Sequence, residues 1–239
     1  MKAVILAGGK GRRLRPYTTV LPKPLMPLGD LPIIEVVLRQ LAAYGFDDVV
    51  MAVGYLAELL MAVCGDGSRF GVRLRYSREE EPLGTAGPLA LIEGLDDTFL
   101  VMNGDVLTTL DLAALVAAHR RSGALATIAT HQRQQQINYG IVESDGANRI
   151  TAYIEKPVYH YQVSMGIYAL EPAVLRFVPR GQYLDLPDLV RRLLAAGHPV
   201  HAYPFDGYWM DIGRPDDYER AVEEFDAMRP LLLPSHRLP

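Results

Sequence analysis

Short apolar runs alternate with segments of helical spacing along the first half of the chain. Runs such as 3–7 and 99–102 contain no polar position, which is typical of strands buried on both faces of a sheet. Between them, apolar residues recur three and four positions apart, as on one face of a helix. Strands are expected at 3–7, 49–53, 72–76, 99–102 and 124–130, and helices at 32–44, 56–63, 86–95 and 112–121. The alternation predicts a mostly parallel sheet covered by helices on both faces.

The pattern changes after about residue 132. Two stretches at 140–143 and 149–154 flank Asp145-Gly146, which predicts a hairpin. Further strands are expected at 163–170 and 200–203, and further helices at 184–196 and 216–228. No linker, repeat or low-complexity tract separates the two halves. The second half is therefore expected to add strands and a rim to the first sheet.

Composition excludes several classes of protein. The formal net charge is −4 over 239 residues, so no basic field attracts nucleic acid. The single cysteine, Cys64, excludes an intrachain disulfide and a cysteine-based metal cluster, and it suits a reducing compartment. No segment approaches the roughly 20 apolar residues that span a bilayer, and the apolar start of the chain is too short for a signal peptide. The expectation is a cytoplasmic protein that binds neither nucleic acid nor a membrane.

The richest chemistry lies in the loop after the first strand, Leu6-Ala7-Gly8-Gly9-Lys10-Gly11-Arg12-Arg13-Leu14. Its glycines let backbone N–H groups approach phosphate oxygens closely, and Arg13 adds a guanidinium that can bind them through two hydrogen bonds. The loop lacks the third glycine of a dinucleotide fold, and Arg12-Arg13 replaces the Lys-Ser/Thr pair of a P-loop. A glycine turn with solvated charges is the alternative. We favour a polyphosphate site of another kind.

Two aspartates far apart in the sequence are candidate metal ligands. Asp105 follows the apolar strand 99–102, and the end of such a strand opens onto the ligand crevice of a parallel sheet. Asp211 lies in Trp209-Met210-Asp211-Ile212-Gly213. Mg²⁺ prefers one or two carboxylates together with phosphate oxygens and water, which two aspartates brought together by the fold would supply. Taken alone, Asp105 reads as a turn residue and Asp211 as a helix cap.

A longer pattern covers residues 8–27: Gly8-Gly9-x-Gly11-x-Arg13-Leu14-x-Pro16, then Leu21-Pro22-Lys23-Pro24-Leu25-x-Pro27. It resembles the signature of the sugar-1-phosphate nucleotidyltransferases, a family that includes glucose-1-phosphate thymidylyltransferases and mannose-1-phosphate guanylyltransferases, and the resemblance runs to about residue 227. It implies a Rossmann-like three-layer α/β/α fold with a mostly parallel, mixed central sheet. It also implies that the loop binds phosphate, that Arg13 and Lys23 are catalytic, and that Asp105 and Asp211 bind Mg²⁺. Arg12 departs from the many relatives that have threonine there.

The same resemblance assigns base binding to the loop Glu79-Glu80-Glu81-Pro82-Leu83-Gly84-Thr85-Ala86-Gly87. Gly84 would let the base lie flat against the backbone. A carboxylate here would accept hydrogen bonds from guanine, and the Pro-Leu-Gly-Thr-Ala-Gly form of the loop resembles mannose-1-phosphate guanylyltransferase-like members more than thymidylyltransferases. GTP is therefore the expected nucleotide, while thymidylyl, uridylyl, cytidylyl and adenylyl transfer and a plain solvated loop stay open. The nucleotide-binding residues so implied are Leu6, Ala7, Gly8, Gly9, Gly11, Arg12, Arg13, Glu79, Glu81, Pro82, Gly84, Thr85, Asn103, Gly104 and Asp105.

The sugar 1-phosphate is expected to bind through the second half of the chain. Glu155-Lys156-Pro157 resembles the family's E-K-P motif, in which the glutamate binds the sugar and the lysine its phosphate. Both side chains face the site only if the chain bends at Pro157, and a solvated charge pair is the alternative. In the element around Gly166, Ser164 replaces the asparagine of many relatives. The sugar-phosphate-binding residues implied are Tyr139, Gly140, Glu155, Lys156, Gly166 and Trp209.

The chain is therefore expected to be one nucleotidyltransferase domain, 1–239. Residues 1–131 would bind the nucleotide, residues 132–228 would bind the sugar phosphate, and residues 229–239 would form a tail. The protein would join an NTP to a mannose- or heptose-like sugar 1-phosphate, with glucose 1-phosphate as an alternative, and release pyrophosphate. A sugar 1-phosphate needs no general base, because its second pKa of about 6 leaves it largely dianionic at neutral pH. A non-catalytic nucleotide-sugar-binding regulatory protein is the alternative of another class, and a homo-oligomer stays open.

Overall fold

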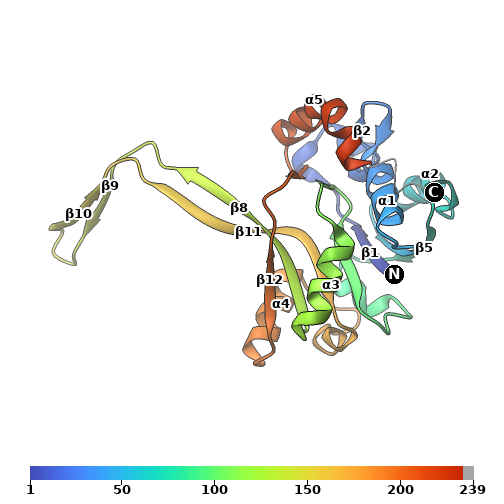
Figure 1. The fold of residues 1–239 in the computed structure, drawn as a ribbon. Coiled ribbons are helices and arrows are strands. Elements are labelled where there is room, and N and C mark those ends of the chain that lie inside the picture. The colour runs from blue at the N-terminus through green and yellow to red at the C-terminus, as the bar shows by residue number, and fades with distance from the viewer. Residues whose placement is uncertain (234–239) are drawn as a thin grey trace.

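The computed structural model describes residues 1–233, and a seven-stranded sheet runs through them (Figure 1). The strand order is β12-β8-β11-β6-β1-β4-β5, and every neighbouring pair is parallel except the two that involve β11. The strands are β1 (Lys2–Ala7), β4 (Asp48–Val53), β5 (Arg73–Arg78), β6 (Phe99–Asn103), β8 (Ala126–Gln136), β11 (Val158–Leu170) and β12 (Val200–Pro204). The predicted fold class is confirmed, and the second half of the chain does extend the first sheet.

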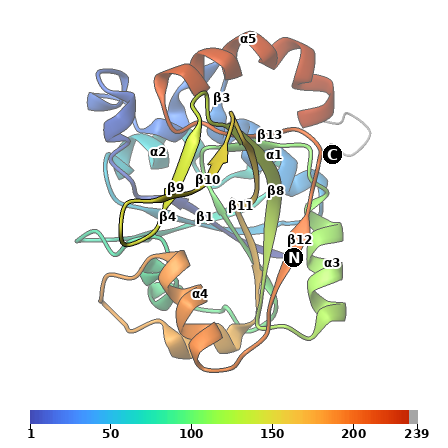
Figure 2. The same ribbon diagram turned by 90° about the vertical axis from the view of Figure 1, so that its left-hand side faces the viewer.

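Helices cover both faces of the sheet because successive side chains of a buried strand point to opposite faces. Ala3, Ile5 and Ala7 of β1 share one apolar core with α1 (Ile33–Ala43), α2 (Ala57–Cys64) and α3 (Leu112–Ser122). Val4 lies in the opposite core with α4 (Leu186–Ala195) and the 3₁₀ helices η5 (Gly87–Leu91) and η6 (Pro172–Phe177). Figure 2 shows α4 on the side of the molecule away from α5.

A third apolar cluster holds α5 (Pro215–Leu232), the last helix of the described residues, against the body. Phe225 of α5 packs there with residues of two short strands, β7 (Val106–Thr108) and β13 (Trp209–Asp211). The small strands β2 (Pro27–Leu28) and β3 (Leu31–Pro32) pair beside them. The predicted tail 229–239 begins inside this helix, which continues through Pro230, and residues 234–239 lie outside the described residues.

One predicted helix is wrong. Residues 86–95 form only the short 3₁₀ helix η5, with Pro88 in its first turn and Gly94 at a φ of +76° beyond its end. The backbone N–H groups of Ala86 and Gly87 both donate to the carbonyl of Leu184, at 2.8 and 3.0 Å. This tertiary pairing and the Gly-Pro start override the helical spacing of the apolar residues.

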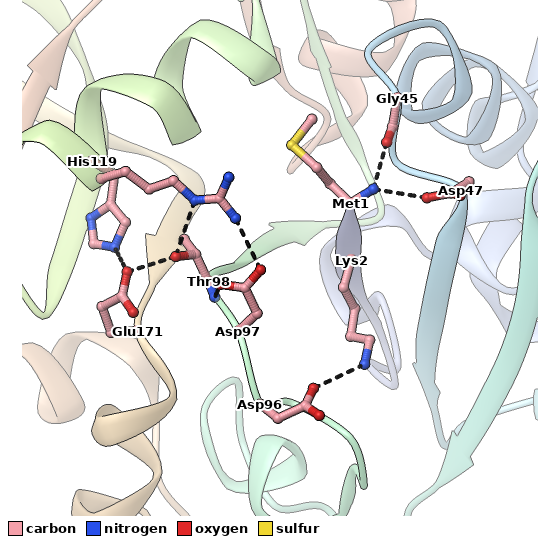
Figure 3. A network of polar contacts seen from close by, with 10 residues as sticks. Met1, Lys2, Gly45, Asp47, Asp96, Asp97, Thr98, His119 and Glu171 are labelled. Carbon is pink, nitrogen blue, oxygen red and sulfur yellow. Dashed lines mark hydrogen bonds and ion pairs between the residues drawn. The ribbon is translucent and has the colours of Figure 1, made fainter.

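The edge of the sheet where the parallel strands begin is fixed by polar contacts (Figure 3). The N-terminal amine donates to the carbonyl of Gly45 at 2.7 Å and to Asp47 at 2.8 Å. His119 of α3 lies 3.1 Å from Glu171 and 2.8 Å from Thr127. Burial lowers the pKa of His119, against the raising effect of Glu171. These groups stabilise the fold at the edge opposite the candidate site.

A long arm, residues 132–162, leaves the sheet at the other edge (Figures 1 and 2). Strands β8 and β11 run on past their neighbours and are therefore longer than the predicted strands 124–130 and 163–170. The arm ends in a ribbon of β9 (Ile141–Ser144) and β10 (Ile150–Ile154), which are antiparallel. The predicted hairpin is thus confirmed, but it stands apart from the body instead of forming a rim on it.

Candidate active site

The loops at the carboxyl ends of β1, β4, β5 and β6 enclose a cavity of about 940 Å³. That volume lies within the roughly 300–1,000 Å³ typical of small-molecule sites, and the carboxyl edge of a parallel sheet is where such sites occur. Every residue predicted to bind nucleotide, from Leu6 to Asp105, lines this cavity, and so does Lys23. A smaller hollow of about 670 Å³ beside β5 shares Arg78, Glu80 and Glu81 but none of the glycine loop.

The glycine loop follows β1 and is held by close backbone contacts. A Cβ on Gly54 would come within 3.2 Å of the carbonyl of Gly8, so the loop after β4 lies directly against it. Gly11 has a φ of +57°, and its carbonyl accepts a hydrogen bond from the Thr18 hydroxyl at 2.8 Å. Arg13 packs over the backbone of Gly213, which has no side chain to obstruct it. The loop therefore offers backbone and guanidinium groups to one cavity.

Lys23 and Asp105 form an ion pair at the end of β6. Lys23 is 9% exposed, and its ammonium binds Oδ2 of Asp105. Asp105 is placed by Gly104, whose backbone N–H donates to the Leu6 carbonyl at 3.0 Å and whose missing Cβ would crowd Ile5. The other carboxylate oxygen, Oδ1, is buried and has no hydrogen-bond partner among the described residues. A buried carboxylate oxygen without a hydrogen-bond partner lowers the stability of the fold, unless a ligand supplies the missing interaction.

Asp211 lies beside Asp105 through the pairing of β13 with β7, in which Asp211 is opposite Val106. The next residue, Ile212, donates its backbone N–H to the Asp105 carbonyl at 3.2 Å. Burial raises the pKa of Asp211, and the charge of Asp105 raises it further, while Lys23 and Arg13 act in the opposite direction. Two carboxylates that repel each other are a fitting pair for a divalent cation.

The donor set suits a metal that takes few protein ligands. Within residues 1–233, no group of three or more His, Cys, Asp or Glu side chains is arranged to hold an ion by itself. Mg²⁺ needs no such cage, because it keeps water and binds through one or two carboxylates and substrate phosphates. The buried, unpartnered oxygen of Asp105 and the neighbouring carboxyl of Asp211 fit that requirement.

The loop predicted to bind the base is anchored at both ends. Glu79 accepts a hydrogen bond from the Leu83 backbone at 2.8 Å, and burial raises the pKa of its carboxyl. Gly84 has a φ of +78°, and a Cβ there would come within 2.6 Å of the Leu184 carbonyl. Asp185 accepts from the backbone and the hydroxyl of Thr85 at 3.0 and 3.1 Å. The loop is therefore closely fitted to the start of α4.

Several cavity residues escape the sequence-based prediction. Asp185, Tyr183 and Gly213 line the cavity although they follow Thr85 in the sequence by about 100 residues or more. Gly54 and Tyr55 also line it, directly after β4. The position of Gly54 and Tyr55 after a buried parallel strand is a signal that could have identified them, because all such strand ends meet at one edge.

Neither Gly166 nor Trp209, two of the predicted sugar-phosphate residues, lines the cavity, but Gly166 adjoins one of its lining residues and Trp209 lies at the root of the arm. Gly166 has a φ of +74°, and a Cβ there would meet the side-chain amide of Asn103, a lining residue. Trp209 is half-buried and donates its indole N–H to the Met165 carbonyl at 3.1 Å. The guanidinium of Arg133 lies 4.9 Å from the Trp209 ring. These contacts join the root of the arm to the edge of the site.

The other four predicted residues, Tyr139, Gly140, Glu155 and Lys156, are on the arm and do not line the cavity. Glu155 and Lys156 form an exposed ion pair with 3.8 Å between Nζ and Oε1. Lys156 has a φ of +43°, so the chain bends there and not at Pro157. The structure thus brings the nucleotide half of the predicted site together and leaves most of the sugar half on the arm.

A Rossmann-like sheet with a glycine-rich loop at its carboxyl edge is typical of nucleotide-binding α/β proteins. The family model described as "Nucleotidyl transferase" matches residues 2–227, and the chain belongs to this family. It is 40% identical over 242 residues to UTP–glucose-1-phosphate uridylyltransferase of Synechocystis, covering 93% of this chain and 62% of that protein. It is 39% identical over 227 residues to mannose-1-phosphate guanyltransferase of Yarrowia lipolytica, covering 91% and 62%.

A solved structure shows the same fold. HddC from Yersinia pseudotuberculosis superposes with a TM-score of 0.72 at 24% identity, over 94% of this chain and 99% of that one. The curated relatives named above are longer, since this chain spans 62% of their length. Among residues 1–233, no helix combines the length and apolar character needed to cross a bilayer.

Proposed function

We propose that this chain transfers a nucleotidyl group from an NTP to a sugar 1-phosphate, giving a nucleotide-sugar and pyrophosphate. The observation that carries the proposal is that the glycine loop, Arg13, Lys23 and Asp105 line one cavity, and that Asp211 lies beside Asp105 without lining the cavity itself. The phosphate of the sugar attacks the α-phosphorus in line, and pyrophosphate leaves. Such a reaction requires positioning and charge neutralisation and no residue that removes a proton, because the attacking oxygen is already anionic.

Each group has a role that follows from its chemistry. The backbone of residues 8–11 cradles the triphosphate, since glycines allow close approach. Arg13 and Lys23 neutralise the charge that develops on the transferred and leaving phosphates. The ammonium of Lys23 is oriented by Asp105, which fixes it at the end of β6.

Mg²⁺ is the proposed cofactor, held by Asp105 and Asp211. The support is the buried, unpartnered Oδ1 of Asp105 and the raised pKa of Asp211. When bound, the ion would offset the mutual repulsion of the two carboxylates and withdraw charge from the phosphates. Lys23 occupies only Oδ2 of Asp105, so Oδ1 is left for the metal.

GTP and mannose 1-phosphate are the proposed substrates. The support is the acidic loop at the cavity, where Glu79 and Glu81 offer carboxylates to the guanine edge, and the similarity to a mannose-1-phosphate guanyltransferase. UTP with glucose 1-phosphate is the second candidate, favoured by the similarity to a uridylyltransferase. The cytoplasm is the proposed location, since the single cysteine, Cys64, is free and cannot form a disulfide within the chain, which suits a reducing compartment.

A matrix of substrates tests this proposal. Pyrophosphate release is measured for five NTPs, each paired with mannose, heptose, glucose and related sugar 1-phosphates, in the presence of Mg²⁺. The highest kcat/KM is expected for GTP with mannose 1-phosphate. If kcat/KM is instead highest for UTP with glucose 1-phosphate, the proposed substrates are wrong but the proposed reaction stands. Specific binding of nucleotide-sugars with no release for any pair would instead favour the non-catalytic binding protein.

Asp185→Ala is expected to raise the KM for the NTP about tenfold, because losing the hydrogen bonds that Thr85 donates costs on the order of 1.4 kcal/mol. The kcat should change little, since Asp185 orients the base loop and contacts no reacting group in the proposed reaction. Asp188→Ala, in the first turn of the helix that Asp185 precedes, is the matched control, because the Asp188 carboxylate pairs with Arg191 on the surface. Equal KM values for the two variants would remove Asp185 from nucleotide binding.

A further inference from the structure

The arm brings together four of the residues predicted to bind the sugar phosphate, but holds them far from the cavity of its own chain. Ile141 pairs with Ile154, so Tyr139-Gly140 and Glu155-Lys156 meet at the base of the ribbon. A Cβ on Gly140 would clash with the Tyr153 ring, which shows how closely the two strands approach there. Four residues that the family resemblance assigns to the sugar phosphate are thus assembled together, away from the rest of the site.

The separation can be estimated from the length of the strand. Gly166 touches Asn103 at the edge of the cavity, and Lys156 precedes it by ten residues of nearly continuous extended chain. At about 3.3 Å per residue this amounts to about 30 Å. A sugar 1-phosphate bound in the cavity is much shorter than this, so it cannot reach Lys156 of the same chain.

Bending the outer joint of the arm does not close that distance. Between Ser164–Thr130 and Val158–Gln136 the two long strands pair residue by residue, and their one break in register lies nearer the body, between Ser164 and Tyr168. The joint with the ribbon comes after this ladder, where Ile137 donates to the Pro157 carbonyl at 3.0 Å. Lys156 is adjacent to the joint, so rotation there turns the ribbon but leaves Lys156 at the outer end of the ladder.

The arm also exposes apolar surface that a folded protein normally covers. Tyr139, Ile150 and Tyr153 are 79%, 66% and 64% exposed, and Val142, Ile154, Val158, Tyr159 and Tyr161 are exposed as well. An isolated two-stranded ribbon is marginally stable in water, and a concentration of exposed apolar side chains marks an interaction surface. Beside the glycine loop and the cavity, Tyr17, Val20 and Tyr183 are likewise exposed. The body thus also exposes apolar side chains close to the glycine loop and the cavity, where the arm of a second copy would cover them.

We propose that two copies of this chain exchange arms, so that the arm of each copy lies over the cavity of the other. The exchange would bring Tyr139, Gly140, Glu155 and Lys156 to a glycine loop in trans and complete the sugar-phosphate half of each site. In a two-fold symmetric dimer each arm lies over the cavity of the other chain, so that no arm and no cavity is left without its counterpart. The inference rests on the proposed function for its ligand. The pairing itself rests on the geometry of the arm.

Complementation tests the exchange. Lys23→Ala disables the body and leaves the arm intact, whereas Lys156→Ala disables the arm and leaves the body intact. The two variants are co-expressed with different tags, the mixed pairs are enriched, and pyrophosphate release is measured with GTP and mannose 1-phosphate. Each variant alone should be nearly inactive. In an equal mixture that has not been enriched, half of the dimers are mixed, and one of the two sites in each mixed dimer is intact. Such a mixture should therefore recover about a quarter of the wild-type rate.

A control pair separates this recovery from artefacts. Lys23→Ala co-expressed with Asp211→Asn carries both lesions in the body, so it should recover nothing. If the test pair also recovers nothing while the wild-type protein is active, the arm serves its own chain and the proposal is overturned. If the wild-type protein itself is inactive with every substrate, the proposed function fails, and the exchange is decided by the next measurement.

The oligomeric state gives a readout independent of activity. Replacing residues 139–155 with a two-residue Asn-Gly turn removes the ribbon and its apolar side chains and leaves the body untouched. Sedimentation equilibrium should find the wild-type chain as a pair and the shortened chain as a monomer, with melting temperatures within a few degrees of each other. A wild-type monomer, or a shortened chain that remains a pair, would contradict the exchange.

Discussion

Asp211→Asn is expected to lower the rate of Mg²⁺-dependent pyrophosphate release by about 10³-fold or more. The substitution keeps the size of the side chain but removes one of the two charges that hold the ion, and metal neutralisation of the phosphates contributes several kcal/mol to the barrier. Rates are measured across a range of Mg²⁺ concentrations at saturating NTP. The loss should persist at the highest concentration if the second carboxylate is needed for the chemistry as well as for metal affinity.

The same substitution is expected to stabilise the metal-free protein at neutral pH. Because the pKa of Asp211 is raised above 3.8 in the folded state, the folded chain binds this proton more tightly than the unfolded chain. Stability from this group therefore falls as pH rises from about 3.8 through the raised pKa. The asparagine side chain of the variant has no charge to bury, so the gain in melting temperature should be larger at pH 7 than at pH 4.

Asp216→Asn is the matched control, because Asp216 is exposed in the first turn of α5 and contributes no charge to the Asp105–Asp211 pair. Its turnover and its response to Mg²⁺ should equal those of the wild type. Added Mg²⁺ should raise the melting temperature of the wild type and of this control, but not that of Asp211→Asn. Normal turnover in Asp211→Asn would remove Asp211 from the metal site.

Lys23→Ala is expected to lower kcat by about 10²- to 10³-fold, the usual cost of removing one group that stabilises developing charge. The effect should appear in kcat more than in the KM for the NTP, because the glycine loop and Arg13 still bind the triphosphate. Removing the lysine also leaves both carboxylate oxygens of Asp105 without a hydrogen-bond partner within residues 1–233. The variant should therefore require higher Mg²⁺ for folding stability than the wild type does.

Lys2→Ala serves as the matched lysine control. Lys2 pairs with Asp48 and Asp96 at the edge of the sheet away from the cavity. Its loss should lower the melting temperature slightly and leave kcat unchanged. A near-normal kcat in Lys23→Ala, or an equal loss in both variants, would show that Lys23 has no specific role in the reaction.

The fold could be predicted because its signals are local. Buried parallel strands leave apolar runs, and residues that follow such runs gather at one edge of the sheet for topological reasons alone. The glycine loop after β1 and Asp105 after β6 could therefore be placed in one site from the sequence. Asp211 follows no long apolar strand, and its pairing with β7 is a tertiary contact, so its place in the site came from the family resemblance.

The features that escaped prediction depend on contacts between distant segments. Asp185 reaches the cavity through Thr85, and neither residue carries a local sign of the other. The helix expected at 86–95 has the right spacing, but the Leu184 carbonyl captures its first backbone N–H groups. The arm is a third case, because the alternation that predicts a hairpin says nothing about whether it lies against the body.

The most direct test of the central claim is the fate of a labelled α-phosphate. The protein is incubated with Mg²⁺, mannose 1-phosphate and GTP labelled with ³²P at the α or the γ position. The α label is expected only in the nucleotide-sugar, and the γ label only in pyrophosphate, because attack occurs at the α-phosphorus. Release of the γ label as inorganic phosphate, or recovery of the α label in free GDP or GMP, would contradict nucleotidyl transfer.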